Sequence, residues 1–312
     1  MSNKLKVFID GQHGTTGLQI RDKLEHHNHV QVIEIATEAR KDINARKALM
    51  NEADIVFLCL PDAASKEIAA DLYHMDTRVI DASSAHRVDE KWVYGLPELR
   101  KEQRARIKNA KYVSNPGCYA TGATLLLNPL SEQGLLGDNT AIHINGYSGY
   151  SGGGTAMINT YESGDTPPAL ALYGLDFQHK HIAEIIKHSG LKRRPSFIPS
   201  VVPIRQGMIV LVAFDKTELN STTKDIKQLY QAKYQGEQFV QVREHDLEQD
   251  KFLNISNLGG SNNCEIYVFE SADQSQVLAV ARLDNLGKGA SSAAIQNMNI
   301  MLGLEESLGI SQ

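Results

Sequence analysis

Cysteine is scarce in this sequence, and its scarcity excludes several classes of protein. Only Cys59, Cys118 and Cys264 occur among 312 residues, and an odd, sparse set argues against a disulfide framework and for a reducing compartment. The usual metal-ligand spacings of cysteine and histidine are also missing, so we expect no bound metal. No apolar run approaches the length of a membrane span, and the N-terminus leads directly into an expected strand rather than a signal peptide. These absences predict a cytoplasmic protein.

An excess of positive charge is missing as well. The net charge is −5, which argues against nucleic acid or an anionic membrane as the main partner. Hydrophobic residues make up 42% of the chain and charged residues 22%, as in ordinary soluble globular proteins. A chain of this length can bury a large core in about two domains. We therefore expect a globular protein whose main partner is neither nucleic acid nor an anionic membrane.

The sequence opens with a pattern typical of nucleotide-binding domains. The β-rich run Leu5–Asp10 is followed by Gly11, Gly14 and Gly17 and then by a helical pattern. Glycines let the backbone approach a pyrophosphate, and the helix N-terminus supplies N–H groups and a favourable dipole. The spacing is one residue off the commoner dinucleotide fingerprint, and a tight turn without a ligand is the alternative. Its position as the first strand–turn–helix unit favours a nucleotide site.

Further β-rich runs alternate with helical patterns through the first half. One of them, at 54–60, is nearly all apolar, as a parallel strand buried on both faces should be. The alternation predicts a Rossmann-type, doubly wound parallel sheet of the α/β class. The other runs expected as strands are 31–36, 78–82 and 112–114.

Charged residues after the second expected strand indicate which dinucleotide binds. In a Rossmann domain an acidic residue here suits the ribose 2′-hydroxyl, whereas basic residues suit a 2′-phosphate. Glu38 favours a ribose 2′-hydroxyl, whereas Arg40 and Lys41 favour a 2′-phosphate. No acid closes the strand itself, so we predict NADP. Solvated charges at the start of a helix are the alternative.

Polar residues follow the strand at 78–82. Ligands of open α/β sheets bind beyond the carboxyl ends of the strands, which makes Ser83, Ser84 and Arg87 candidate site residues. Arg87 could bind an anionic group of the substrate through its planar fork of donors. A surface ion pair is the alternative role for this side chain.

A strand, a tight turn and a helix are expected to meet in the stretch 114–121. Pro116 fixes φ, and Gly117 allows backbone geometry that other residues resist. Cys118 then falls at or near the first turn of the helix, where the dipole and free N–H groups favour a thiolate. This makes Cys118 a candidate nucleophile. A small buried side chain after a turn is the alternative.

The second half shows β-rich runs without regular crossover helices between them. This pattern predicts an α+β domain with a mostly antiparallel sheet. The glycine- and serine-rich stretch 146–155 is expected as a loop whose backbone N–H groups line a ligand site, rather than as a flexible linker. The runs expected as strands are 141–145, 208–214, 238–242, 265–269 and 277–283, with an amphipathic helix near 223–234.

Another expected helix, beginning near His179, carries candidate acid/base residues. His181 and Glu184 are three residues apart and so lie on one face of a turn. A thiol nucleophile needs an acid/base partner, which is normally distant in sequence. A histidine that is simply exposed or buried in the core is the alternative.

Two further positions are suited to anions. Arg205 lies between a proline and a glycine at the entry to a strand, and is a second candidate for an anionic substrate group. Gly287 and Gly289 flank Lys288 just before the last expected helix, whose N-terminus suits an anion.

Eight short stretches that extend over almost the whole chain, from near residue 5 to near residue 308, together match one known family. They are Gly11-x-x-Gly14-x-x-Gly17, Asp81-x-Ser83 through Arg87, Ser114 through Thr121, the loop at 148–154, His179-Lys180-His181-x-x-Glu184, Val202-Pro203-x-Arg205-x-Gly207, Gly260-Ser261-Asn262-x-Cys264, and Asp284-Asn285-Leu286-x-Lys288-Gly289-Ala290. Any one of them is unspecific, whereas all of them in order are specific. The sequence thus resembles the shorter form of the N-acetyl-γ-glutamyl-phosphate reductases, of the aspartate-semialdehyde dehydrogenase-like superfamily.

The resemblance implies a small-molecule substrate and NADPH-dependent reduction of N-acetyl-L-glutamyl 5-phosphate to the 5-semialdehyde, with release of phosphate, in arginine biosynthesis. Cys118 would attack the acyl phosphate and form a thioester, and His181 would be the acid/base, with His179 as the second choice. The substrate-binding residues that it implies are Ser83, Arg87, Asn115, Ser148, Ser151, His179, Glu184 and Arg205. The implied cofactor-binding residues are Gly11, Gly14, Thr15, Thr16, Gly17, Arg40, Lys41, Pro61, Ser83, Gly153, Asn285, Gly287 and Lys288.

Residues 1–117, completed by a C-terminal helix at 288–312, are expected as the NADP-binding Rossmann domain, and 118–287 as the catalytic, substrate and dimerisation domain. A broad antiparallel sheet could supply an isologous interface, so we expect a homo-oligomer, either a dimer or a tetramer. One departure concerns the cofactor, because Asp10 ends the first strand where the longer form of the family usually has a small or apolar residue.

Three other functions are compatible with parts of the pattern. Aspartate-semialdehyde dehydrogenase shares the expected fold and chemistry. A non-catalytic, NADP-sensing regulator would keep the Rossmann fold but would need neither a reactive thiol nor a base. A cysteine hydrolase would use the Cys/His pair but has no use for the glycines at 11–17.

Overall fold

The computed structural model describes residues 4–163, 167–219 and 226–311. They fold into two compact units. The first unit comprises 4–97, 101–116 and 290–311, and the second comprises 98–100 and 117–289. The chain therefore passes from one unit to the other just before Cys118 and returns just after Gly289.

The first unit contains a fully parallel six-stranded sheet of order β2-β1-β3-β4-β6-β5. This confirms the predicted α/β, doubly wound architecture. Strand β2 is shorter than predicted, and the two-residue strand β5 was not predicted, because so short a run carries no readable alternation. The strands are β1 (Leu5–Asp10), β2 (Val30–Ile33), β3 (Ile55–Leu58), β4 (Arg78–Asp81), β5 (Val93–Tyr94) and β6 (Tyr112–Ser114).

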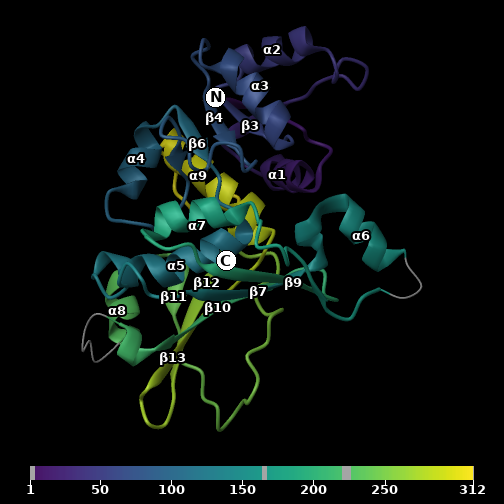
Figure 1. Ribbon diagram of the computed structural model, residues 1–312. Helices are drawn as coiled ribbons and strands as arrows, with labels where there is room; N and C mark the ends of the chain where they lie inside the picture. The colour runs from purple at the N-terminus through teal and green to yellow at the C-terminus, as the bar shows by residue number, and fades with distance from the viewer. Residues whose placement is uncertain (1–3, 164–166, 220–225, 312) are drawn as a thin grey trace. The chain divides into compact units, whose positions relative to one another are not determined.

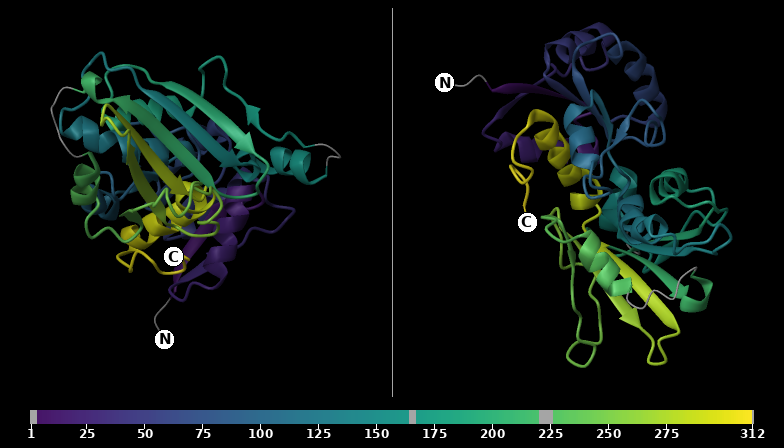
Figure 2. Two further views of the ribbon diagram at one scale, coloured as in Figure 1. Left: turned by 90° about the horizontal axis from the view of Figure 1, so that it is seen from below. Right: turned by 90° about the vertical axis from the view of Figure 1, so that its left-hand side faces the viewer.

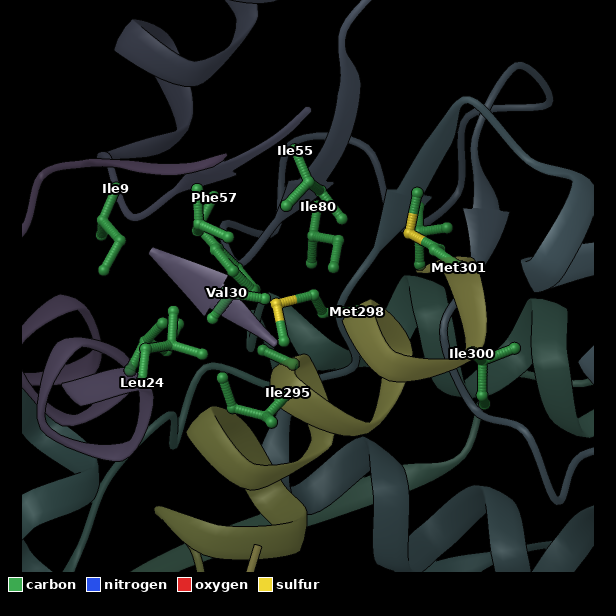
Figure 3. Packing of buried hydrophobic residues seen from close by; sticks show 14 of the residues in the cluster. Ile9, Leu24, Val30, Ile55, Phe57, Ile80, Ile295, Met298, Ile300 and Met301 are labelled. Carbon is green, nitrogen blue, oxygen red and sulfur yellow. The ribbon is translucent and has the colours of Figure 1, made fainter. Parts of the chain in front are cut away.

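Helices cover both faces of this sheet because successive side chains of a strand point to opposite faces. On β1, Val7 and Ile9 pack into one core, whereas Phe8 packs into the other. Figure 3 shows the first core, in which Ile295 and Met298 of the last helix lie against the strand side chains. The helices of this unit are α1 (Thr15–Glu25), α2 (Ile43–Glu52), α3 (Asp62–Leu72), α4 (Gln103–Asn109) and α9 (Ser292–Leu302).

Helices α2 and α3 contribute to the second core, on the opposite face (Figure 1). Helices α1, α4 and α9 contribute to the first. A short π-helical turn, Gly287–Ser291, precedes α9.

The second unit contains a seven-stranded sheet of order β11-β12-β13-β10-β7-β9-β8, whose strands lie side by side in Figure 2. Four of its six pairings are antiparallel, and β7–β9 and β11–β12 are parallel. The prediction of a mostly antiparallel sheet is confirmed. The strands are β7 (His143–Gly149), β8 (Ala171–Leu172), β9 (Ser196–Val202), β10 (Met208–Asp215), β11 (Val240–Val242), β12 (Cys264–Glu270) and β13 (Gln276–Leu283).

Helix α5 (Cys118–Glu132) is the central helix of this unit, and its residues from Tyr119 to Leu130 are all buried. It packs on β10 and β13 and beside α7 (His181–Ser189). The other helices are η1 (Tyr150–Gly153), α6 (Gly154–Glu162), η2 (Lys216–Glu218) and α8 (Ile226–Lys233). Helix α8 falls within the predicted helix at 223–234, of which 223–225 lie outside the described residues. Across the part of the chain that the structure describes, no helix is both long and apolar enough to cross a membrane.

The stretch 146–155 is not the loop that its composition predicted. Strand β7 continues to Gly149, η1 follows at once, and α6 begins at Gly154. Gly149 can remain in the strand because the backbone of Arg205 lies against it: a Cβ on Gly149 would be 2.6 Å from the Arg205 carbonyl oxygen. The glycines here permit close backbone packing rather than an open loop.

Candidate active site

Cys118 is the first residue of α5, and Gly117 is its N-cap residue. The Cys118 side chain is half-buried and forms no disulfide. A thiol at this position lies at the positive end of the helix dipole, next to N–H groups that have no partner within the helix. These features favour a thiolate, the reactive form of cysteine.

Gly289 lies directly against Cys118. A Cβ on Gly289 would be 2.7 Å from the Cβ of Cys118 and 3.1 Å from the carbonyl oxygen of Asp284. Real Cβ atoms do not approach one another so closely, so the backbone at 289 can occupy this place only as glycine. The role of Gly289 next to the thiol follows from tertiary packing and has no local sequence signal.

Glu184 connects α7 to the N-terminus of α5. Its carboxylate is almost fully buried, and Oε2 accepts the backbone N–H of Gly117 at 3.1 Å. Its other oxygen, Oε1, lies 3.9 Å from Nε2 of His181, which is also buried. The residue spacing predicted that His181 and Glu184 share a face of the helix, and this is confirmed. The contact of that face with the residue preceding Cys118 could not be read from the sequence.

The side chain of His179 binds the first N–H of α7, whose N-cap residue is Lys180. Nδ1 of His179 accepts the backbone N–H of His181 at 3.1 Å. An accepting Nδ1 carries no proton, so this bond favours the tautomer of His179 that has its proton on Nε2. The two rings are 4.6 Å apart, edge to face. The structure therefore gives the two histidines different positions, with His181 buried beside Glu184 and His179 at the helix cap.

Two tyrosines that the sequence did not single out as site residues surround the histidines. The ring of Tyr119 lies 5.9 Å from that of His179 and 6.0 Å from that of His181, and Tyr173 lies 5.7 Å from His179. Burial raises the pKa of Tyr119, and burial together with the nearby Cys118 raises the pKa of Tyr173 to about 12. Both phenols are therefore neutral hydrogen-bonding groups at neutral pH.

Tyr119 is fixed in place by its neighbours. Its hydroxyl donates to the carbonyl oxygen of Ser200 at 2.9 Å. Its ring lies against Gly146, where a Cβ would be 2.4 Å away. Tyr119 follows Cys118 in sequence, and this adjacency was the only signal that could have identified it.

Ser151, Asn285 and Arg205, all predicted site residues, bind to one another. Asn285 donates to Oγ of Ser151 at 2.9 Å, and Ser151 donates to the backbone carbonyl of Arg205 at 2.5 Å. The side-chain oxygen of Asn285 accepts the backbone N–H of Gly207 at 2.9 Å. These bonds join η1, the turn before β10 and the segment after β13. They give Asn285 and Ser151 a positioning role in this unit.

The remaining predicted residues of this unit differ in exposure. The Arg205 guanidinium is 62% exposed and pairs with Glu162 at 3.0 Å, so it can reach an anion from solvent. Ser148 is buried and donates to the carbonyl of Gly149 at 3.0 Å. Gly153 is exposed at the start of α6.

Lys288 does not have the position that its predicted cofactor role requires. Its ammonium forms an ion pair with Glu98 at 2.7 Å, and both side chains are 0% exposed. A buried ion pair excludes solvent and other ions unless it is broken. The side chain is therefore not presented to a cofactor phosphate. The backbone of Gly287 is equally enclosed, since a Cβ there would be 1.9 Å from the carbonyl oxygen of Ser261.

In the first unit, the glycine turn after β1 fits a dinucleotide phosphate. Gly11 has φ +90° and lies so close to β3 that a Cβ would be 2.3 Å from the carbonyl oxygen of Cys59. Helix α1 begins at Thr15 after the exposed N-cap residue Gly14, and its first turn carries no acidic residue. Gly17 is buried against the turn. The turn thus leads into a helix N-terminus whose dipole meets no opposing charge in its first turn.

Asp10 ends β1 immediately before this turn, and its carboxylate is occupied. Arg46 of α2 donates to it in bidentate fashion, from Nε to Oδ1 at 3.0 Å and from Nη2 to Oδ2 at 2.5 Å. The negative charge beside the turn is therefore neutralised within the protein. This accounts for an acidic residue at a position where it would otherwise repel a phosphate.

Five other predicted cofactor residues lie near helix starts in this unit. Thr15 and Thr16 are half-buried in the first turn of α1, and Pro61 is the exposed N-cap residue of α3. Arg40 and Lys41 are exposed in the turn between β2 and α2. A phosphate can therefore approach the charged groups of Arg40 and Lys41 from the solvent side.

A buried cluster follows β4. The Asp81 carboxylate, 0% exposed, accepts the backbone N–H of Ser83 at 2.9 Å, the Ser83 hydroxyl at 2.7 Å and Nδ1 of His86 at 2.6 Å. His86 in turn stacks on Trp92 at 4.2 Å. Ser84 donates its backbone N–H to Asp62 at 2.9 Å. The Ser83 hydroxyl is thus oriented by Asp81, and His86 holds that carboxylate.

Arg87 and Asn115 are buried at the carboxyl ends of β4 and β6. Arg87 donates to the carbonyl oxygens of Asn115 at 2.9 Å and Ala82 at 3.2 Å, and so is not a surface ion pair. The Asn115 amide donates to the carbonyl of Ala290 at 3.0 Å and accepts from Asn297 at 3.2 Å. In this structure both side chains therefore support the segment that leads to Cys118. Over the residues described, no group of histidine, cysteine or acidic side chains is arranged to hold a metal ion.

Family models match most of the chain. Residues 6–108 match the semialdehyde dehydrogenase NAD-binding domain, and residues 118–285 match the semialdehyde dehydrogenase dimerisation domain. Among curated relatives, N-acetyl-gamma-glutamyl-phosphate reductase of Trichormus variabilis is 44% identical over 99% of this chain and 100% of its own length. The enzyme of the same name from Brucella ovis is 46% identical over 96% of this chain and 99% of its own.

Solved structures of low sequence identity share the fold. Aspartate semialdehyde dehydrogenase II from Vibrio cholerae has a TM-score of 0.74 at 17% identity, covering 97% of this chain and 99% of its own. Aspartate semialdehyde dehydrogenase from Candida albicans, solved with NADP, has a TM-score of 0.62 at 16% identity, covering 96% and 99%. These likenesses establish the fold.

Proposed function

Because this chain belongs to the N-acetyl-gamma-glutamyl-phosphate reductases, within the semialdehyde dehydrogenase superfamily, we propose how its residues perform that reaction. The enzyme is an NADP-dependent oxidoreductase that reduces N-acetyl-L-glutamyl 5-phosphate to N-acetyl-L-glutamate 5-semialdehyde with release of phosphate, a step of arginine biosynthesis. The observation that carries the mechanism is the position of Cys118 at the start of α5, beside the buried His181–Glu184 pair.

In the first step the Cys118 thiolate attacks the acyl carbon of the substrate. A carbon–sulfur bond forms, and the bond to the phosphate oxygen breaks with its electron pair on the phosphate. His181, as an imidazolium, donates a proton to the departing phosphate. The acyl group is then held on Cys118 as a thioester.

In the second step the thioester is reduced. NADPH, which the glycine turn after β1 and the start of α1 would hold, would supply the hydride that the thioester carbon accepts. The resulting thiohemiacetal collapses, the carbonyl re-forms as the aldehyde, and the sulfur electrons return to Cys118 as the thiolate. The two steps together consume one proton, which His181 donates and the released phosphate carries away.

The anionic groups of the substrate need cationic or N–H partners. Arg205 is exposed and already faces one carboxylate, Glu162, so it can exchange that partner for a substrate carboxylate or phosphate. The Arg87 guanidinium, although buried, is the other candidate. Arg40 and Lys41, which are exposed after β2, would bind the 2′-phosphate of NADP.

Oligomerisation follows from family membership, because the second unit matches a dimerisation domain. A homodimer or a tetramer in the cytoplasm is the finer proposal, and sedimentation of the purified protein distinguishes the two assemblies.

The reaction is tested most directly in reverse. Purified protein should reduce NADP in the presence of phosphate and N-acetylglutamate 5-semialdehyde, and NAD should be a poorer acceptor. Cys118→Ser should abolish the activity, and iodoacetamide should label Cys118 ahead of Cys59, whose pKa burial raises. Activity with aspartate semialdehyde alone would contradict the substrate assignment, and full activity of Cys118→Ser would contradict the mechanism.

Cofactor binding is tested separately from turnover. The double substitution of Arg40 and Lys41 by alanine should weaken NADP binding about tenfold or more, since each of the two changes removes a charge-assisted contact. NAD binding should change little. Fluorescence titration of the apo-protein measures both, and equal losses for the two nucleotides would show that these residues do not read the 2′-phosphate.

A further inference from the structure

The buried Glu184 carboxylate raises a question that the proposed reaction leaves open. Its side chain is 1% exposed, and burying a carboxylate is costly unless donors compensate it. The substrate carries a phosphate and a carboxylate, both of which a second negative charge would repel. Direct contact with these groups is therefore a poor explanation for Glu184.

The contacts of Glu184 point instead to the two residues that perform the chemistry. Oε2 accepts the N–H of Gly117, the residue that directly precedes Cys118. Oε1 lies 3.9 Å from Nε2 of His181, one helical turn away. A single rigid carboxylate thus faces the turn that carries the thiol and the imidazole that transfers the proton.

Glu184 is the carboxylate that the structure places against the His181 ring. Tyr119 lies 6.0 Å away and stays neutral because burial raises its pKa. The His179 ring lies 4.6 Å away, and its Nδ1 accepts the backbone N–H of His181. A thiolate on Cys118 would add a second negative charge to the site before acylation, and this charge is lost while the acyl group is bound to the sulfur.

We propose that Glu184 is a positioning residue that couples the acid/base His181 to the nucleophile, by fixing the Gly117 turn with one oxygen and favouring the imidazolium with the other. This inference rests on the proposed function, since it assigns Glu184 to the same Cys118 and His181. It replaces the predicted role of Glu184 as a direct substrate ligand. The carboxylate has to be buried because in a site of low dielectric its charge acts on His181 with little screening.

The test compares the pH dependence of turnover in wild type and Glu184→Gln. Glutamine keeps an oxygen that can accept the Gly117 N–H but removes the charge. At high pH kcat falls as His181 loses its imidazolium proton. In Glu184→Gln this fall, the high-pH limb of the profile, should occur at a pH lower by about one unit, because a nearby negative charge raises the pKa of an imidazolium by about that much. At the optimum kcat should fall about tenfold while KM changes less than about twofold. Glu132→Gln, which removes a carboxylate at the other end of α5 paired with Lys233, should leave the profile unchanged.

Other outcomes distinguish the alternatives. A rise in KM with an unmoved pH limb would overturn the proposal in favour of a substrate ligand. If thermal stability falls while the pH profile of kcat stays as in wild type, Glu184 has only a structural role and the proposal is wrong. If Glu184→Gln does not fold, Glu184→Asp gives the answer: it retains the charge, so the limb should stay within a few tenths of a unit of wild type while kcat falls. A limb displaced in Glu184→Asp would contradict the inference.

Coupling through His181 is measured by a double-mutant cycle. In a His181→Gln background, adding Glu184→Gln should cost less than about twofold in kcat, because residues acting as one unit are not additive. Full additivity would contradict the coupling. Failure of the proposed function has a different signature, since Cys118→Ser would then stay active whatever Glu184 does.

Discussion

Nδ1 of His179 accepts the backbone N–H of His181 at 3.1 Å, and this bond separates two histidines that are equivalent in the sequence pattern. One ring nitrogen of His179 is used to cap α7, whereas His181 is buried beside a carboxylate. An acid/base group must be able to gain and lose a proton without losing its orientation. His181, whose Nε2 faces Glu184, is our proposed acid/base, since protonation of His179 on Nδ1 would break the bond to the N–H of His181.

The first prediction follows for the two histidines. His181→Gln should lower kcat by about a hundredfold or more, the usual contribution of a general acid or base. His179→Asn should keep most activity, because an asparagine oxygen can accept the same N–H, and His179→Ala should lose about 1 kcal/mol of stability with the cap. Steady-state kinetics and thermal unfolding measure these effects. A larger kinetic loss in His179→Asn than in His181→Gln would reverse the assignment.

The second prediction concerns the contact between Gly289 and Cys118. Gly289→Ala would introduce a Cβ 2.7 Å from that of Cys118, so the thiol or the backbone must move. We expect a stability loss of about 1 to 3 kcal/mol and a loss of activity larger than the fraction of unfolded protein explains. Gly259→Ala is the control, since a Cβ there would meet only the Ser256 carbonyl oxygen at 3.7 Å. Unchanged labelling of Cys118 in Gly289→Ala would show that the contact does not position the thiol.

The third prediction concerns the ion pair beside the glycine turn. Arg46→Ala leaves the buried Asp10 carboxylate without its bidentate partner, which should cost about 3 to 5 kcal/mol in the free energy of unfolding. It should also weaken NADP binding, because the uncompensated charge repels the pyrophosphate. Lys6→Ala, which breaks an exposed pair with Glu52, should cost less than about 1 kcal/mol. Urea denaturation and nucleotide titration provide the two readouts, and equal stability losses for the two variants would contradict this account.

The fourth prediction separates structure from cofactor binding at Lys288. Because its ammonium is fully buried with Glu98, Lys288→Met should lower the stability by about 3 to 5 kcal/mol. The NADP affinity of the folded fraction should remain within about twofold of wild type. Replacing both partners, with Glu98→Gln added to Lys288→Met, should recover part of the stability. A specific loss of NADP affinity in a stable Lys288→Met protein would restore the predicted cofactor role.

Local pattern was sufficient for the architecture of this protein. The glycine turn, the apolar β3 and the N-terminal place of Cys118 in α5 are all effects of neighbouring residues: alternation, φ preferences and helix starts act over a few positions of the chain. The same holds for the shared face of His181 and Glu184. The prediction of a loop at 146–155 was wrong, because Gly149 in this stretch allows close packing against the backbone of Arg205.

The chemical environment of the site was decided by tertiary structure. Glu184 meets the N–H of Gly117 across 67 positions of the chain, Lys288 meets Glu98 across 190, and Gly289 lies against Cys118. Charge, burial and contact depend on which distant segments pack together, and no periodicity in the sequence encodes such pairs. The amino-acid sequence by itself thus determined the fold class, the family and the candidate nucleophile. Only the tertiary structure decided which carboxylate, which histidine and which lysine face one another, because those pairings arise from long-range packing of buried groups.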